Sequence, residues 1–577
     1  MSTSIHWFRK ALRLSDNPAL IEACKKSQHV YPLFIMDPKF RQGQMSVNRQ
    51  NFLLQCLHDL DKSLKCLGSR LFVLEGKPDD ILPQLVADWN IDLITYEHCT
   101  GPYSIERDAK IAKLFNDDKC NSKVKISTHH SHTLYPLDLY LTKCGAKGIP
   151  KTYKSFCDLI KTLNTPRLPI NAPISRTSEA SETDNVSLPL PRIKDLNNMN
   201  DYNIPTLLHI RNTTSTSTST TDNNNDDDNI PTATASDIFP GGETFGLKRL
   251  NDMIIQNKNY VKNFEKPNTS PNSLIPSTTV LSPYITMGCI SVIQMYNEIN
   301  KHRPLATDPP VSLIGQLLWR EFFYLHSISS PPGASFDKML GNPLCKQIPW
   351  DDNPILFNAW KNGQTGFPFI DAIMIQLKTQ GWIHHLARHA VACFLTRGDL
   401  WQSWEKGAEY FEYTLLDGDW ALNNANWQWL SCSRFFHQYG RCYSPIAFGK
   451  KTDPTGEYIR KWLPKLKNYP TKYIYEPWTA PMNIQNTSGC IIGIDYPKPI
   501  IDDHTTISKF NMGRMKAAYA GTATATATVN GSADTGDESS SAAAKTTKSR
   551  KVKAEDNDST PSVSTYFAPA AKKSRKE

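Results

Sequence analysis

Two histidines stand where they could handle a proton together. His385 and His389 belong to the run HHLARH at residues 384–389 and are four positions apart. On a helix, residues at i and i+4 share one face, with their Cβ atoms about 5–6 Å apart. Imidazole has an unperturbed pKa of about 6.5, so it can donate or accept a proton near neutral pH. The spacing predicts a pair that holds one shared proton, and two packed core histidines are the plainer alternative.

The segment that must position these histidines reads as helical. From Ile238 to about His504 the chain is rich in Trp, Phe and Tyr, and helical patterns dominate between breaks that contain proline. Alternating, strand-like runs are few there. The pattern predicts a large all-α domain around the histidine pair.

A different organisation precedes it. Short β-rich runs occur at residues 5–8, 30–36, 71–74, 92–96 and 124–127. Amphipathic stretches at 48–67, 79–89 and 105–115 lie between them. Strand–helix alternation predicts a parallel sheet covered by helices, hence a doubly wound α/β domain.

Two segments lack the apolar residues that a core requires. Residues 212–228 are almost entirely Thr, Ser, Asn and Asp, and the end of the chain is of low complexity. We therefore expect an α/β domain at 4–135, a connector with a disordered insert at 136–237, a helical domain at 238–510 and a disordered basic tail at 511–577. Basic clusters at 545–553 and 572–576 are typical of segments that bind nuclear import receptors or nucleic acid, and a merely solubilising tail is the alternative.

Composition excludes several classes of protein. No apolar run is long enough to span a membrane, and strand-like sequence begins too early to leave room for a signal peptide. The 13 cysteines never form Cys-x-x-Cys, so no metal site is expected from spacing. A net charge of +9 is compatible with nucleic-acid binding without requiring it.

Four stretches resemble the photolyases and cryptochromes. They are HWFRKALRLSDNP at 6–18, GQTGFPFIDA at 363–372, GWIHHLARH at 381–389 and WQWLSCS at 427–433. The likeness covers roughly residues 4–170 and 238–505, and several long motifs in order are more specific than one short pattern. It implies FAD in the helical domain and an optional second antenna chromophore, of folate or deazaflavin type, in the α/β domain.

The resemblance also implies a set of FAD-binding residues. Residues 278–282 offer hydroxyl and backbone N–H groups that suit pyrophosphate oxygens, and Arg388 and Asp417 would pair beside the flavin ring. An ordinary Ser/Thr-rich turn and a structural ion pair are the alternatives for these groups taken singly. The matching residues are Phe264, Thr278, Thr279, Leu281, Ser282, Gln316, Arg320, Arg388, Asp417, Asp419 and Asn423.

The resemblance also bears on the redox state of the flavin and on a path for electron transfer. Photolyases usually have Asn at the position of Asn423, plant cryptochromes Asp and insect light-sensing cryptochromes Cys, so Asn423 favours a stable, fully reduced flavin. Electron-transfer tryptophans of the family match Trp427, nearest the flavin, then Trp404 and Trp350. Trp401, one helical turn before Trp404, would extend this path, and core packing is the alternative role.

The histidine pair indicates which DNA lesion would be bound. Enzymes that split cyclobutane dimers resemble this stretch but carry Asn and Met at the two histidine positions. Repair of a (6-4) photoproduct also needs a proton, so the resemblance implies His385 as general acid and His389 as its tuning partner. Side chains that would surround the extruded lesion are Lys248, Gln316, Trp319, Trp429 and Tyr443.

We therefore expect a (6-4) DNA photolyase, a light-driven lyase that uses FAD and acts on UV-damaged DNA as a nuclear monomer. The main alternative is an animal-type cryptochrome acting as a blue-light receptor or as a clock or transcription regulator. Animal clock cryptochromes share much of the helical domain, including the histidine pair, so these residues alone leave both open. A cyclobutane-dimer photolyase is the third reading.

Overall fold

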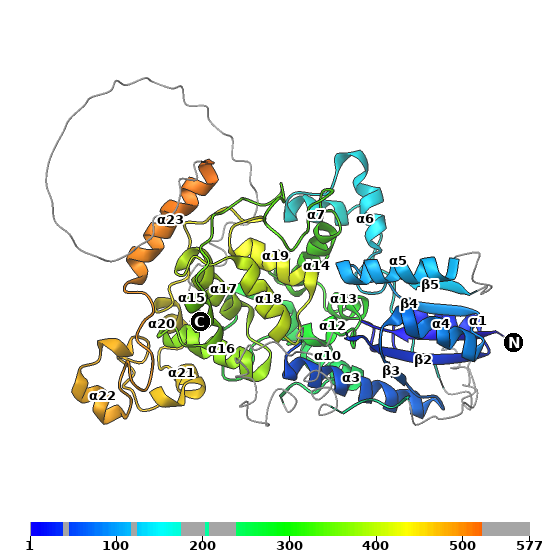
Figure 1. Cartoon of the computed structure of the whole chain (residues 1–577), viewed down its shortest axis with the longest axis horizontal. Coiled ribbons are helices and arrows are strands. Elements are labelled where there is room, and N and C mark those ends of the chain that lie inside the picture. The colour runs from blue at the N-terminus through cyan, green and yellow to red at the C-terminus, as the bar shows by residue number, and fades with distance from the viewer. Residues whose placement is uncertain (1, 39–44, 117–123, 175–201, 207–237, 522–577) are drawn as a thin grey trace, which may run out of the picture.

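The computed structural model describes residues 2–38, 45–116, 124–174, 202–206 and 238–521 (Figure 1). The expected low-complexity insert at 212–228 and the two basic clusters of the tail lie outside these residues.

The N-terminal domain is built on a parallel sheet of five strands in the order β3-β2-β1-β4-β5. Its central strand β1 is buried along its whole length, as expected for a sheet that helices cover on both faces. This confirms the predicted doubly wound α/β domain. The strands are β1 (Thr3–Phe8), β2 (His29–Met36), β3 (Phe72–Glu75), β4 (Leu93–Glu97) and β5 (Lys125–His129), and the helices between them are α1 (Pro18–Lys26), α3 (Val47–Cys66), α4 (Pro78–Trp89) and α5 (Pro102–Asn116).

Part of the expected connector is folded. Helices α6 (Leu137–Cys144) and α7 (Tyr153–Ile160) follow β5, with the 3-10 turn η1 (Gly145–Lys147) between them, and both pack against helix α14 (Leu313–Ser327). The ring of Tyr153 stacks on Trp319 of α14, with centroids 3.9 Å apart, and its hydroxyl donates to the Gly315 carbonyl at 3.0 Å. These two helices therefore belong to the wall that supports α14.

The C-terminal domain is helical, which confirms the second half of the predicted fold class. Apart from two isolated bridges, residues 238–521 contain no β-pairing. Besides α14, its elements are α10 (Glu243–Leu250), the π-helix η4 (Asn251–Ile255), α11 (Lys258–Asn263), η5 (Lys266–Asn268), α12 (Ser282–Thr286), α13 (Val292–Asn300), α15 (Pro354–Asn362), α16 (Pro368–Gln380), α17 (His385–Cys393), the π-helix η6 (Phe394–Gly398), α18 (Trp404–Thr414), α19 (Trp420–Leu430), α20 (Ala447–Thr452), α21 (Glu457–Trp462), η7 (Pro464–Leu466), η8 (Pro477–Thr479), α22 (Met482–Ser488) and α23 (His504–Ala520).

Helix α23 runs through the boundary expected at residue 510. Asp503 caps it by accepting from the Thr506 N–H at 2.8 Å, and Asn511 donates to the carbonyls of Gly398 and Asp399 at 3.2 Å. Residues 511–520 are thus ordered by contacts with η6, where the sequence predicted the start of the tail. No helix in the described part of the chain is both long and apolar enough to cross a membrane.

The two domains lie side by side along the long axis of the molecule (Figure 1). Helix α3 of the first domain packs against α10 of the second, and Asn48 donates to the Lys378 and Thr379 carbonyls at 3.0 Å. Glu243 of α10 accepts from the N–H groups of Leu14 and Ser15 at 2.7 and 2.9 Å. Buried polar contacts therefore fix the orientation of one domain on the other.

Candidate functional site

A cavity of about 180 Å³ lies in the helical domain, and it brings together side chains that are far apart in sequence. Helices α14 and α19 form two of its walls, and α17, η5 and η6 contribute one residue each. Six residues expected at the site from sequence line it: Gln316, Trp319, Arg320, His389, Trp429 and Tyr443. The others are Lys266, Phe323, Arg397, Leu422, Asn426, Leu430 and Phe436.

Helix α14 presents one face to this cavity. Ser312 begins the helix by accepting from the Gly315 N–H at 3.2 Å, a standard N-cap arrangement. Gln316, Trp319 and Phe323 follow at spacings of three and four, so they share a face. Trp319 meets Trp429 of α19 edge to face, with ring centroids 5.1 Å apart. The cavity thus has two nearly perpendicular indole walls.

Helix α17 carries the histidine pair as the spacing predicts. His384 caps the helix by accepting from the Leu386 N–H at 3.1 Å, so His385 is its first residue and His389 lies one turn later. The two imidazole rings stand 5.9 Å apart at 84°. His389 contacts the Tyr443 hydroxyl at 3.1 Å, whereas His385 Nε2 is buried and has no hydrogen-bond partner among the described residues.

The charge state of these histidines differs from the expectation. Burial, reinforced by Lys266 and His384, lowers the pKa of His389 to about 3. Burial and the adjacent His384 also hold the pKa of His385 well below its ordinary value. Burial among cations therefore favours the neutral form of both imidazoles, whereas their spacing alone predicts a shared proton.

Lys266 and Arg397 are the two cations of the cavity lining that sequence reasoning missed. Lys266 lies on the short 3-10 turn η5, which shows no periodicity, and its side chain lines the cavity. Burial and the nearby Arg388 lower the pKa of Lys266 to about 8. The sequence could have revealed Phe323, since it continues the spacing of Gln316 and Trp319, but nothing local marks Lys266.

Arg388 and Asp417 pair as predicted. Arg388 Nη2 lies 2.9 Å from Asp417 Oδ2, and Arg388 Nε donates to the Ile383 carbonyl at 3.0 Å. Ser282 Oγ also donates to Asp417 Oδ2 at 2.6 Å. The fold thus joins three of the expected FAD-binding residues from α12, α17 and the loop before α19.

Several buried polar atoms at this site lack protein partners. Asp417 Oδ1 and Arg320 Nη2 make no hydrogen bond within the described residues, although Arg320 lines the cavity. An unsatisfied buried donor or acceptor costs about 1–3 kcal/mol, so such atoms indicate a missing ligand. A group with both donors and acceptors, as FAD has, fits these atoms.

The remaining expected FAD-binding residues lie on several different elements and differ in burial. Thr278 and Thr279 lie in the half-buried loop before α12, Leu281 is buried at its cap, and Phe264 is buried at the end of α11. Asn423 donates through Nδ2 to the Ala408 carbonyl at 2.7 Å, which ties α19 to α18.

Asp419 makes its contacts with protein groups. It caps α19 by accepting from the Leu422 N–H at 3.1 Å and accepts from the Tyr324 hydroxyl at 2.5 Å. Burial would raise the pKa of Asp419, but Lys10 and His132 hold it well below the ordinary value. Both carboxylate oxygens are thus engaged within the protein.

Lys248 is not brought to the cavity. It lies on α10, where its amine is 2.7 Å from Asp252, one turn later in the π-helix η4. Its side chain is 73% exposed, and it is absent from the cavity lining. Of the five expected lesion-binding residues, the other four line the cavity.

The four expected electron-transfer tryptophans are connected through the core. Trp427 and Trp404 belong to one buried cluster, and Trp350 packs both against it and against a smaller cluster that contains Trp401. The rings of Trp350 and Trp401 are 4.8 Å apart. Sequence reasoning missed Trp360, whose ring lies 6.2 Å from that of Trp427.

Trp401 does not sit on the helix of Trp404. Its φ is 52°, in the left-handed region, and Ser403 then caps α18 by accepting from the Glu405 N–H at 3.2 Å. Helix α18 therefore begins at Trp404, and the expected helical turn between the two tryptophans is wrong. Trp401 contacts Trp350 because the chain bends there.

Two protein families match this chain, one in each of the two domains described above. A family described as DNA photolyase matches residues 4–173, and a family described as FAD binding domain of DNA photolyase matches residues 313–517. Cryptochrome-1 of Macaca fascicularis is 45% identical over 520 residues, which are 89% of this chain and 83% of that protein. Cryptochrome-2 of Gallus gallus is 44% identical over 521 residues, with the same two shares.

Solved structures agree with these matches. A bacterial class III photolyase from Agrobacterium tumefaciens has a TM-score of 0.70 and 27% identity, covering 90% of this chain and 98% of that one. A Synechocystis cryptochrome has a TM-score of 0.71 and 26% identity, covering 89% and 99%. The expected FAD-binding domain is confirmed.

These relatives also correct one expectation. The two relatives named above at 44–45% identity over most of their length are cryptochromes and not photolyases. The prediction that the chain is a (6-4) DNA photolyase enzyme is therefore wrong, and the alternative weighed beside it is the better supported. The histidine pair misled because it occurs in both groups.

Proposed function

Because this chain belongs to the photolyase and cryptochrome family, we propose that it works as an animal-type cryptochrome, a FAD-binding regulator that acts by binding partners. The observation that carries the proposal is the 45% identity to an animal cryptochrome over 83% of its length. The regulator is either a blue-light receptor or a clock or transcription regulator, and the experiment below separates these forms. FAD, when bound, supplies absorption of blue light and one-electron chemistry.

Protein groups around the cavity suit an electron-rich ring. Arg388, held by Asp417 and by the Ile383 carbonyl, offers a fixed positive charge, and Lys266 adds a second cation. Ser282, Thr278 and Thr279 would contact the phosphate portion.

Trp427, Trp404, Trp350 and Trp401 would form the path for electrons between the half-buried Trp350 and the cavity. The indole N–H groups of Trp350 and Trp404 are buried and have no acceptor within the described residues. Unpaired buried N–H groups are uncommon in cores and are consistent with a redox role for these rings.

The test uses purified FAD-loaded protein under blue light. Two duplexes, one with a (6-4) photoproduct and one with a cyclobutane dimer, are scored for restored bases, while the flavin absorption band is followed without DNA. We expect neither lesion to be repaired, and light-dependent loss of the flavin band would identify a receptor. A band unchanged by light would identify the light-independent regulator, and restored bases in either duplex would overturn the proposal.

A variant sharpens the light measurement. Trp427→Phe keeps an aromatic ring in the buried position but removes the indole, so it should slow loss of the flavin band in a receptor. Trp462→Phe is the matched control because Trp462, on α21, is half-buried and outside the path.

Binding of UV-damaged DNA is a separable part of the proposal. Gln316, Trp319, Trp429 and Tyr443 line the cavity and could stack on and hydrogen-bond an extruded pyrimidine pair. Stacking is worth about 1–3 kcal/mol per base, so Trp429→Ala should weaken binding in the dark about fivefold or more. Equal affinity for damaged and undamaged duplex, measured by fluorescence anisotropy, would contradict this part.

We also propose nuclear location, directed by the basic clusters at 545–553 and 572–576. Replacing the lysines and arginines of both clusters with glutamine in a fluorescent fusion should move the signal to the cytoplasm. A signal that stays nuclear would refute a role for these clusters.

A further inference from the structure

A second cavity, of about 480 Å³, lies between the segment 130–167 and helix α13 and shares no lining residue with the flavin cavity. We propose that it binds a small organic anion, a molecule with a flat apolar body and one carboxylate, phosphate or sulfonate group. None of the residues expected from sequence to act at the flavin site contributes to it.

The inner wall of this cavity is apolar. Leu134, Tyr135 and Ile293 line it and are 3%, 9% and 2% exposed, and Leu139 and Leu163 complete the surface. Tyr135 donates its hydroxyl to the Asn164 carbonyl, which holds the ring against the wall. Such a wall would contact a planar ring or a short hydrocarbon body.

The rim carries cations and no anion. Lys143 and Arg167 line the cavity together with His130 and several threonines, and none of the lining residues is Asp or Glu. No ion pair of Lys143 is found among the described residues, and Asp138 is the one carboxylate on its helix α6. A buried apolar wall beside an uncompensated ammonium group favours a ligand that is apolar at one end and anionic at the other.

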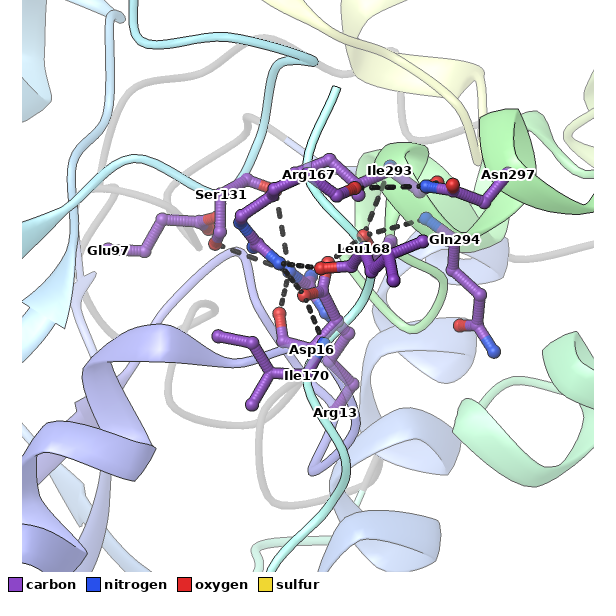
Figure 2. A network of polar contacts seen from close by, with 11 residues as sticks. Arg13, Asp16, Glu97, Ser131, Arg167, Leu168, Ile170, Ile293, Gln294 and Asn297 are labelled. Carbon is purple, nitrogen blue, oxygen red and sulfur yellow. Dashed lines mark hydrogen bonds and ion pairs between the residues drawn. The ribbon is translucent and has the colours of Figure 1, made fainter. Parts of the chain in front are cut away.

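Arg167 is held in place by a polar network (Figure 2). Its Nη1 is paired with Asp16 Oδ1 and donates to the Leu168 carbonyl at 2.9 Å, while Asp16 Oδ1 also accepts from the Ile170 N–H at 3.0 Å. Nε and Nη2 of Arg167 make no hydrogen bond within the described part of the chain and stay available to a ligand. Asp16 offsets part of this charge, which leaves Lys143 as the main anion-binding group.

The same network fixes the opposite wall. Asn297 of α13 donates through Nδ2 both to the Arg167 carbonyl at 3.0 Å and to the Ile293 carbonyl at 2.8 Å. The rim cation and the apolar wall are thereby joined by one side chain (Figure 2). The site is preorganised, so binding does not require ordering a loop.

The volume sets the size of the ligand. Small-molecule sites are typically about 300–1,000 Å³, mostly apolar with a few polar groups that fix orientation, and this cavity fits that description. A polynucleotide or a folded partner would not fit in it. A metal ion is disfavoured because the lining has a single histidine and no carboxylate or thiolate.

The test uses FAD-loaded full-length protein, so that the flavin cavity is filled, and 8-anilinonaphthalene-1-sulfonate as a fluorescent anion. We expect one saturable site. Leu163→Trp fills the cavity from its wall and Thr162→Trp from its exposed rim, and each should abolish saturable binding while FAD content is unchanged. Leu141→Trp on the outer face of α6, where Leu141 is 41% exposed, is the matched control and should bind as the unmodified protein does.

The anionic requirement has its own control. Lys143→Gln should weaken binding of the sulfonate up to about fivefold, as expected for a partly exposed charge pair, whereas Lys147→Gln should not. The uncharged analogue 1-anilinonaphthalene should bind both variants equally. Absence of a saturable site, or undiminished binding to both tryptophan variants, would overturn the proposal, and a Lys143→Gln effect on both molecules would refute the anionic class.

Discussion

Gly407 allows a sharp test of how the core holds Trp427. This glycine lies inside helix α18, where glycine costs about 1 kcal/mol relative to alanine, so its presence needs a reason. A Cβ atom at Gly407 would lie 2.2 Å from Cη2 of Trp427 and 2.8 Å from Cδ2 of Leu395. The absent side chain is therefore the space that the indole fills.

The cost of Gly407→Ala follows from that distance. Carbon atoms in contact are about 3.5–4.0 Å apart, so the indole would have to retreat by about 1.3 Å or more. Trp427 is 2% exposed and its ring meets Phe411 and Trp360, with centroids 5.0 and 6.2 Å away, so it has no free space. Overpacking of this kind costs about 3 kcal/mol, and the gain in helix propensity returns about 1 kcal/mol, for a net loss of about 2 kcal/mol.

The assay is chemical unfolding of FAD-loaded protein, with Gly513→Ala as the matched control. Gly513 lies inside helix α23, and a Cβ there would meet nothing within 4 Å, so the same substitution should stabilise that helix by up to about 1 kcal/mol. Trp427→Phe removes the clashing atoms, so Gly407→Ala should cost about 2 kcal/mol less in that background. Equal stability of Gly407→Ala and Gly513→Ala, or no coupling to Trp427, would refute the packing argument.

Three further changes test other parts of the structure. Burial and Arg388 lower the pKa of His384 to about 3 in the folded state, so protonation of the unfolded chain lowers the stability of the fold as pH falls below about 6.5. His384→Asn keeps a side-chain acceptor for the helix cap and removes this titration. Between pH 7 and 5.5 the variant should therefore lose about 1 kcal/mol less stability than the unmodified protein, as measured by thermal unfolding. Arg388→Gln leaves the buried carboxylate of Asp417 without its cation and should cost about 3 kcal/mol and lower the ratio of flavin to protein absorbance; an unchanged ratio would count against the pair as part of the flavin site. Gly288→Ala would place Cβ 1.5 Å from the Lys10 carbonyl oxygen at a φ of 69°, so it should destabilise the domain interface by at least about 3 kcal/mol, and soluble protein with native protease resistance would contradict this.

The sheet could be predicted from sequence because its signals are local. The run predicted at 30–36 became β2 (His29–Met36), and the helix predicted at 79–89 became α4 (Pro78–Trp89). Apolar runs bounded by Gly, Pro and Asn carry this information within a few residues. The contacts that order 511–520 come from η6, which is remote in sequence, so the end of α23 could not be read locally.

The sequence predicted most of the residues that form the site, but it did not predict their charge states. The spacing of His385 and His389 placed both on one face of α17, as the structure has them. Their neutrality depends on burial and on Lys266, which belongs to a turn without periodicity far upstream. Lys248 shows the converse, because resemblance placed it at the lesion while α10 turns its side chain to solvent.

The geometry of the flavin cavity depends on the α/β domain as much as on the helices that line it. Glu321 of α14 accepts from the Leu134 N–H and the Tyr140 hydroxyl at 2.9 Å. Asp419, the cap of α19, lies 3.6 Å from the Lys10 amine. Each of these two cavity walls therefore carries a buried carboxylate that contacts residues preceding the helical domain.

A buried carboxylate that loses its partner is strongly destabilising. A shift of α14 or α19 relative to the sheet would break the contacts of Glu321 or Asp419 and would therefore be unfavourable. Arg320 lies on α14 and Asn423 on α19, so the positions of these two residues are restrained in the same way. The two domains of Figure 1 thus act as one unit at the cavity, because the N–H and amine groups of the first domain set the positions of the helices that form its walls.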